Sequence, residues 1–228
     1  MVGGLNTHRR MIARLSAAAG APALSVAYRM LPAATLPEMV DDCLAAYRHL
    51  LDLGHPADRI VVAGDSAGGF LSFATPLQAI RDGLPAPGGI VAISPLTDLD
   101  HTAKLAHANL LLDPFIPGSR LPLLNDLLLA DLAPDPLHSP VNGALSQLPP
   151  TLIHCGSTEI LRVDSELMAD RLAQAGVPVT LVIWDRQPHV FQIFADACRE
   201  GLRSLTELGA FVRALPATRA SGNRDTAA

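Results

Sequence analysis

The chain has 228 residues, of which 49% are hydrophobic, and a formal net charge of −5. This length and apolar content predict one domain with a sizeable core. The acidic balance and the lack of a basic cluster argue against nucleic acid as a partner. No apolar run reaches the ~18 residues that a membrane span requires. The three cysteines, Cys43, Cys155 and Cys198, have neither zinc nor redox spacing, so we expect buried free thiols.

The N-terminal part of the chain allows two interpretations. Arginines precede an apolar, alanine-rich stretch that ends in Ser25-Val26-Ala27 and superficially resembles a signal peptide. Gly20 and Pro22 interrupt that stretch, however, and the sequence after Ala27 continues a strand pattern. We therefore predict a helix over 7–19, a turn and a buried strand over 23–28, and we expect a cytoplasmic protein.

Strand and helix patterns alternate along the rest of the chain. Helical spacing over 37–53 places apolar residues on one stripe, with Pro37 in the first turn. Pro76 falls inside the helix predicted for 67–81, where it should cost about 3 kcal/mol or force a kink. The alternation predicts a mostly parallel sheet with helices on both faces, in a single domain over 1–215. The other expected elements are strands over 59–63, 89–94, 150–155 and 178–184, short helices within 100–140, helices over 165–175 and 193–215, and a disordered tail over 216–228.

The sequence Gly64-Asp-Ser-Ala-Gly68 directly follows an apolar strand and precedes a helical pattern. In G-x-S-x-G the strand turns sharply into a helix and presents the serine above the sheet. We attribute Gly64 and Gly68 to a turn too tight for side chains on either side of Ser66. Ser66 is the predicted nucleophile, and the N–H of Ala67 is the expected oxyanion donor. The alternative is an ordinary glycine-rich turn.

A serine nucleophile needs a base and an orienting carboxylate, and in this architecture they follow it in the order acid, then histidine. His189 lies in the loop after the last strand and is the predicted base, with an ordinary loop histidine as the alternative. Glu159, just after the preceding strand, is the predicted acid. Asp164 is the second choice, and it could instead cap the next helix. We expect His154 to lie in the core and the other six histidines to be surface or capping groups.

Short motifs surround these three residues along the chain. They are Gly64-Asp-Ser-Ala-Gly-Gly69, Tyr28-Arg-Met-Leu-Pro32, Ser94-Pro-Leu-Thr-Asp98, Asp113-Pro-Phe115, Ser139-Pro140, Leu148-Pro-Pro150, Glu159-Ile-Leu161 and Pro188-His-Val190. In these motifs and their order the chain resembles the hormone-sensitive-lipase-like branch of the α/β-hydrolases, which comprises bacterial carboxylesterases and acetyl esterases.

The resemblance implies hydrolysis of small acyl esters or lactones through an acyl-enzyme on Ser66, with His189 as base and then acid. Glu159 would be the carboxylate, although many members carry aspartate there. The resemblance further implies that 100–140 forms part of a cap, and that a homodimer could form through 178–184 and 193–215. A triad needs no metal or organic cofactor.

The family carries His-Gly-Gly-Gly just upstream of the matched region, and this motif supplies most of the oxyanion hole. By register, Gly3 and Gly4 correspond to residues after that motif. We therefore expect an α/β-hydrolase fold that lacks the first three strands and the N-terminal cap, as in a fragment or a shortened reading frame. A gap would then separate 23–28 from 59–63, unless a trimmed variant pairs these strands directly. A non-catalytic small-molecule-binding protein and an inactive fragment are the alternative functions.

Overall fold

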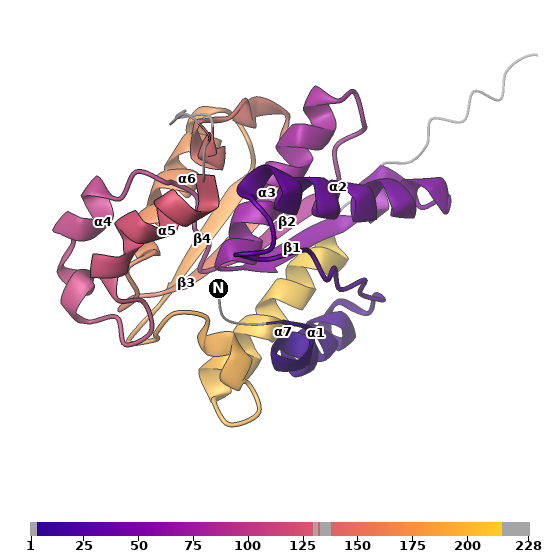
Figure 1. Ribbon diagram of the computed structural model, residues 1–228. Coiled ribbons are helices and arrows are strands. Elements are labelled where there is room, and N and C mark those ends of the chain that lie inside the picture. Colours follow the sequence, from indigo (N-terminus) through magenta and orange to yellow (C-terminus); the bar gives the residue numbers. More distant parts are fainter. Residues whose placement is uncertain (1–3, 130–131, 133–137, 216–228) are drawn as a thin grey trace, which may run out of the picture.

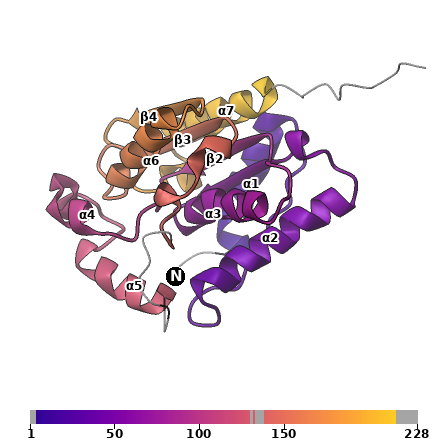
Figure 2. The ribbon, with the colours of Figure 1, turned by 90° about the horizontal axis from the view of Figure 1, so that it is seen from above.

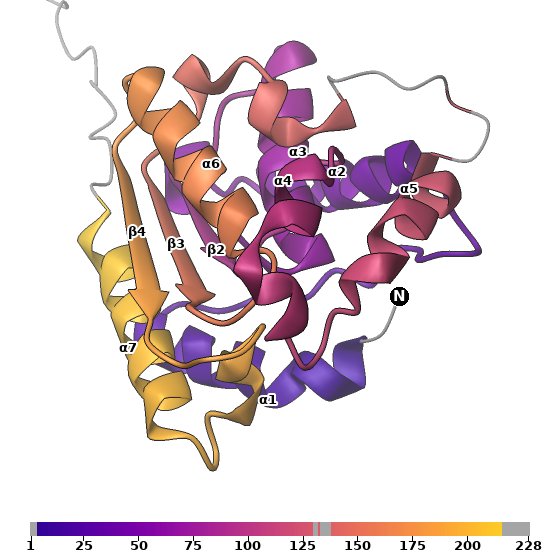
Figure 3. The same cartoon turned by 90° about the vertical axis from the view of Figure 1, so that its left-hand side faces the viewer.

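A computed structural model describes residues 4–129, 132 and 138–215. The tail expected over 216–228 lies outside the described residues. Four parallel strands form one sheet in the order β1-β2-β3-β4. Figure 3 shows the arrowheads of β3 and β4 pointing the same way, so the carboxyl ends of the strands share one edge of the sheet. The strands are β1 Val61–Asp65, β2 Gly89–Ile93, β3 Thr151–Gly156 and β4 Val179–Trp184.

Helices cover both faces of this sheet and make three layers (Figures 1 and 3). Helices α1 (Leu5–Ala19) and α7 (Arg199–Ala214) pack together on one face. On the other face lie α3 (Ala67–Arg81) and α6 (Arg162–Gln174), with α2 (Leu36–Asp52) against α3.

The alternation of side chains along β2 explains the layers. Val91 and Ile93 join the core cluster on the α1 and α7 side, whereas Ile90 and Ala92 join the cluster with Phe73 of α3. All five residues of β2 are buried, because successive side chains of a strand point to opposite faces and both faces are covered.

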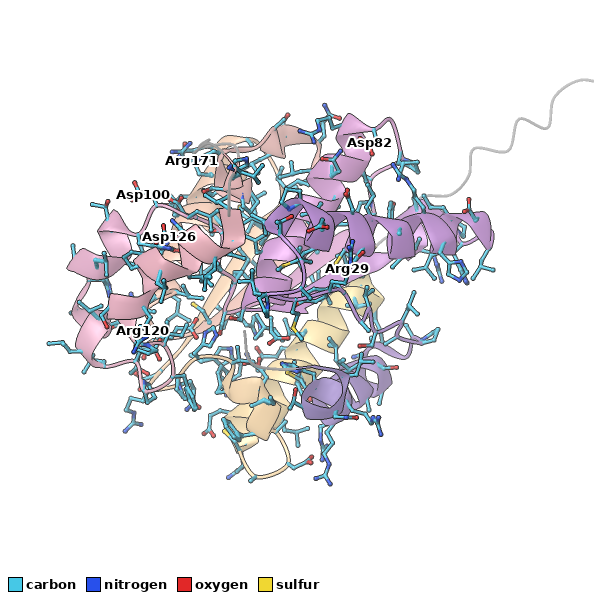
Figure 4. All side chains as sticks on the ribbon, in the orientation of Figure 1. Arg29, Asp82, Asp100, Arg120, Asp126 and Arg171 are labelled. Carbon is cyan, nitrogen blue, oxygen red and sulfur yellow. The ribbon has the colours of Figure 1, made fainter. Side chains whose placement is uncertain are left out.

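Residues 102–129 form a lobe of short helices at one side of the molecule, as expected from the sequence (Figures 1 and 2). Arg120 and Asp126, labelled in Figure 4, belong to this lobe, and Asp100 lies just before it in the chain. The lobe contains α4 Thr102–Ala106, η2 Ala108–Leu111, η3 Gly118–Arg120 and α5 Leu121–Leu129, and other short turns are η1 Ala57–Arg59, η5 Pro140–Asn142 and η6 Leu145–Gln147.

Helix α3 spans Ala67–Arg81 with Pro76 inside it, as predicted. One expectation about the helices needs correction. The helix expected over 193–215 is divided, because a turn η7 (Phe191–Phe194) precedes α7, which begins only at Arg199. Within the described ranges, no helix combines the length and the hydropathy that crossing a membrane requires.

The strand predicted over 23–28 is wrong. Residues 22–30 have no regular secondary structure, and Leu24 is 54% exposed. The apolar pattern is real, but a strand exists only where a neighbour completes its ladder of hydrogen bonds. In the described part of the chain, β1 pairs with β2 alone, so direct pairing between 23–28 and 59–63 is not seen either.

Candidate active site

Ser66 stands at a sharp turn between a strand and a helix. Strand β1 ends at Asp65, α3 begins at Ala67, and Ser66 has a φ of 55° and a ψ of −114°. A non-glycine residue with this backbone is strained and persists only where its surroundings hold it. Here the Ser66 N–H donates to the carbonyl of Ile93 over 2.9 Å, and the Ser66 carbonyl accepts from the N–H of Leu96 over 3.2 Å. Ile93 at the end of β2 and Leu96 in the loop after it therefore bond both the N–H and the carbonyl of Ser66.

The glycines around Ser66 differ in what they permit. A Cβ on Gly64 would lie 2.0 Å from the carbonyl oxygen of Gly68, so this position requires glycine. A Cβ on Gly68 would meet nothing within 4 Å. The prediction that the turn is too tight for a side chain at Gly68 is therefore wrong. The second crowded glycine is Gly69, whose Cβ would lie 2.7 Å from the Cα of Pro95.

Ser66, His189 and Glu159 come together at the carboxyl edge of the sheet. Nε2 of His189 lies 2.9 Å from Oγ of Ser66, and Nδ1 lies 3.2 Å from Oε2 of Glu159. The Glu159 side chain is fully buried and that of His189 is 11% exposed. A carboxylate can only accept, so the Nδ1–H of His189 donates to Glu159 and Nε2 accepts from the Ser66 hydroxyl. This is the proton arrangement of a serine nucleophile with its base.

The loops of Glu159 and His189 are bonded to each other. The Ser157 N–H donates to the carbonyl of Trp184, and the Arg186 N–H donates to Oγ of Ser157, each over 2.8 Å. Thr158 Oγ1 donates to the carbonyl of Gln187, also over 2.8 Å. Glu159 and His189 are thus carried by two loops, beyond β3 and β4, that are hydrogen-bonded to each other.

A hydrogen bond from the end of β2 supports His189. The next residue, Val190, has a φ of 50°, a costly conformation for a β-branched side chain. Its N–H donates to Oγ of the buried Ser94 over 3.1 Å. Because Ser94 follows β2 and Val190 follows His189, this bond joins the loop of His189 to the centre of the sheet.

Ala67 is the first residue of α3, so the helix itself leaves its N–H without a partner. That N–H is the predicted oxyanion donor. Gly4, the described one of the two N-terminal glycines, has its N–H bonded to Oγ1 of Thr7 over 2.9 Å. This amide belongs to the start of α1.

Asp164 has a different environment from Glu159. Its buried carboxylate lies 2.6 Å from Nζ of Lys104 and accepts from the N–H groups of Thr97 and Asp98, at 2.7 and 3.0 Å. Lys104 also donates to the carbonyls of Asp98 and Asp100. Burial raises the pKa of Asp164, against the opposing effect of Lys104. Asp164 therefore joins the loop after β2 to α6, while Glu159 is the carboxylate bonded to His189.

His8 contacts Asp65, next to the turn that carries Ser66, and no local sequence pattern predicts this contact. Its Nε2 lies 3.1 Å from Oδ2 of Asp65, the residue before Ser66, and this carboxylate raises the pKa of His8. His154 lies in the core as predicted, and burial lowers its pKa to about 4. The three cysteines are free, but only Cys155 is fully buried. The described residues include no cluster of three histidine, cysteine, aspartate or glutamate side chains that could hold a metal ion.

A family model described as the α/β hydrolase fold matches residues 1–193. The chain belongs to this family. The α/β-hydrolase is 38% identical to esterase LipU of Mycobacterium tuberculosis over 92% of this chain and 73% of LipU. It is 40% identical to an acetyl-hydrolase of Streptomyces hygroscopicus over 93% of this chain and 71% of that protein. The carboxylesterase/phospholipase LipF of M. tuberculosis is 38% identical, and the chain spans 58% of its length.

Solved structures that resemble this chain are also esterases. An esterase from the bacterial hormone-sensitive lipase family superposes with a TM-score of 0.90 at 36% identity, over 94% of this chain and 72% of that one. The α/β-hydrolase fold and the resemblance to hormone-sensitive-lipase-like esterases, both expected from the sequence, are confirmed. Because these relatives are esterases, a non-catalytic binding protein is not favoured.

Proposed function

We propose that this hydrolase cleaves small acyl esters or lactones through an acyl-enzyme on Ser66, with His189 as the base and Glu159 as the acid. The single observation that carries the proposal is the continuous set of contacts from Ser66 Oγ through both imidazole nitrogens of His189 to the buried Glu159 carboxylate. Asp164, the alternative acid, forms a salt bridge with Lys104 instead.

In the first half of the reaction, Oγ of Ser66 attacks the ester carbonyl carbon while its proton moves to Nε2 of His189. Glu159 stabilises the imidazolium, and the N–H of Ala67 donates to the oxyanion. The tetrahedral intermediate then collapses. The bond from the carbonyl carbon to the alkoxide oxygen breaks, and His189 returns the proton to that oxygen. The acyl group stays on Ser66.

In the second half, water attacks the acyl carbon and gives a proton to Nε2 of His189. The bond to Ser66 Oγ breaks, the serine recovers its proton, and the carboxylic acid leaves.

The test compares the 228-residue chain with Ser66→Ala on p-nitrophenyl acetate and butyrate. We expect turnover in the first and none above background in the second. A fluorophosphonate, which phosphonylates an activated serine and releases fluoride, should label only the peptide that contains Ser66. Equal turnover by Ser66→Ala, or labelling elsewhere, would refute the proposal.

We also propose that residues 100–140, which include the lobe, form part of a cap on the acyl side of the site, as the family resemblance implies. The homodimer and the cytoplasmic location stay predictions from the sequence. Light scattering coupled to size exclusion tests the first, and cell fractionation tests the second.

A further inference from the structure

The loop that carries Glu159 is bonded to residues of the lobe, about fifty positions earlier in the chain. The lobe approaches α6 and the end of β3, where that loop begins (Figure 3). Two of its side chains, Asn109 of η2 and Asp113 just after η2, bond the backbone of residues 157–160.

Asn109 binds two carbonyl groups at once. Its side-chain Nδ2 donates to the carbonyl of Ser157 over 2.9 Å and to that of Glu159 over 2.8 Å. The side chain is largely buried, with the residue 5% exposed, so these bonds form away from water. A carboxamide has two N–H donors in a fixed plane, and here both are used on one turn of backbone.

Asp113 holds the neighbouring group of the same peptide. Its Oδ2 accepts from the N–H of Ile160 over 2.8 Å, while Oδ1 accepts from the N–H groups of Phe115 and Ile116. The peptide bond between Glu159 and Ile160 thus has its carbonyl held by Asn109 and its N–H held by Asp113. Hydrogen bonds to an ionised carboxylate are about twice as strong as neutral ones.

The Glu159 carboxylate has little else to fix its direction. Oε2 faces His189, but Oε1 is buried and has no hydrogen-bond partner in the described part of the chain. A carboxylate with both oxygens bonded would be oriented by its own contacts. With one oxygen bonded, the direction of Glu159 depends on where its backbone is held.

We propose that Asn109 and Asp113 are positioning residues for the reaction: they fix the peptide of Glu159 so that its carboxylate faces His189. This inference rests on the proposed function, since it assumes that Glu159 is the acid. It gives the segment 109–113 a role in the triad in addition to any role in covering the substrate.

The experiment measures kcat and KM for p-nitrophenyl acetate in Asn109→Ala, Asp113→Ala and Asp113→Asn. Displacements near 1 Å in an active site cost about 10² in rate, so we expect kcat to fall ~10- to 100-fold in both alanine variants. KM should stay within about twofold, because neither residue is assigned a substrate contact. Asp113→Asn keeps an acceptor oxygen and should recover part of the loss.

Asn125→Ala is the matched control. In the unsubstituted chain, Nδ2 of Asn125 donates to the carbonyl of Leu99 and Oδ1 contacts His101. The control variant therefore removes the same carboxamide group from the same lobe, but not a bond to 157–160. We expect its kcat to stay within about twofold of the unsubstituted chain. A kcat loss in Asn125→Ala equal to that in Asn109→Ala would overturn the positioning role in favour of general support by the lobe.

A double-mutant cycle separates positioning from stability. If Asn109 acts through Glu159, then Asn109→Ala should cost less than about twofold in a Glu159→Gln background. An undiminished loss in that background would refute the inference. If Glu159→Gln itself kept full kcat, the acid assignment would fail and the positioning role with it. If Glu159→Gln lost activity but both alanine variants kept it, only the positioning role would fail.

A spectroscopic readout does not depend on turnover. The His189 Nδ1–H bonded to a carboxylate should give a downfield proton NMR signal, identified by its absence in His189→Asn. We expect this signal in the unsubstituted chain and in Asn125→Ala, and its loss or broadening in Asn109→Ala. An unchanged signal in Asn109→Ala would contradict the proposal.

Discussion

Replacing Gly64 by alanine tests whether the close approach of Gly64 to Gly68 holds Ser66 in place. A Cβ on Gly64 would lie 2.0 Å from the carbonyl oxygen of Gly68 and 2.3 Å from its carbon. An ordinary contact begins near 3.4 Å, so the first turn of α3 must move by roughly 1.4 Å. Overpacking of this kind costs about 1–3 kcal/mol of unfolding free energy. Displacement of Ser66 by such a distance should reduce its reactivity about 100-fold or more.

Gly68→Ala is the internal control, because Gly68 lies the same distance from Ser66 in sequence and a Cβ there meets nothing within 4 Å. Alanine is favoured over glycine within helices by up to about 1 kcal/mol, so this variant should be as stable as the unsubstituted chain or more so. Urea unfolding and the rate of fluorophosphonate labelling measure the two effects. If Gly64→Ala matched the unsubstituted chain in both, or if Gly68→Ala were equally damaged, the geometric reasoning would be wrong.

Three further predictions concern groups around the site. In Ser94→Gly the φ of 47° suits glycine, but the Val190 N–H loses its acceptor. We therefore expect kcat to fall about five- to tenfold with little change in KM, and an unaltered kcat would contradict this. The control is Ser72→Ala, which removes another buried serine hydroxyl. Lys104→Met leaves Asp164 buried without its cation and should cost about 3–5 kcal/mol in urea unfolding. The double variant with Asp164→Asn should recover at least half of that cost, and no recovery would count against the pairing. Burial lowers the pKa of His154 to about 4 in the folded state, so its contribution to stability is complete above the unfolded pKa near 6.5 and is lost as pH falls toward 4. Unfolding free energy should therefore drop by about 3 kcal/mol over that range, and His154→Asn should flatten the decline.

The sequence was most informative where a local pattern determines the structure. All four strands of the sheet and the helix after Ser66 were predicted, because a short apolar run bounded by glycine, proline or polar residues needs no distant contact to be recognised. The order of Ser66, Glu159 and His189 pointed to residues that the structure brings together, since each follows a strand whose carboxyl end meets the same edge.

The sequence failed where the outcome depends on a partner elsewhere in the chain. Residues 23–28 have a strand pattern, but no neighbouring strand gives them a ladder. The pairing of Lys104 with Asp164 spans sixty positions, and nothing local at either residue indicates it. Gly68 matched the motif as well as Gly69 did, although only the second is crowded, because the contact is with Pro95 beyond the next strand.

The position of β1 has a consequence for local opening of the molecule. The strand that leads to Ser66 lies at the end of the described sheet, its residue Ala63 is exposed, and β2 bonds it on one side only. Amide protons of β1 that point away from β2 should exchange with deuterium far sooner than those of the enclosed strand β2. The edge of the sheet that carries Ser66 should then open before its centre, and exchange in β1 should slow if another strand pairs with that edge.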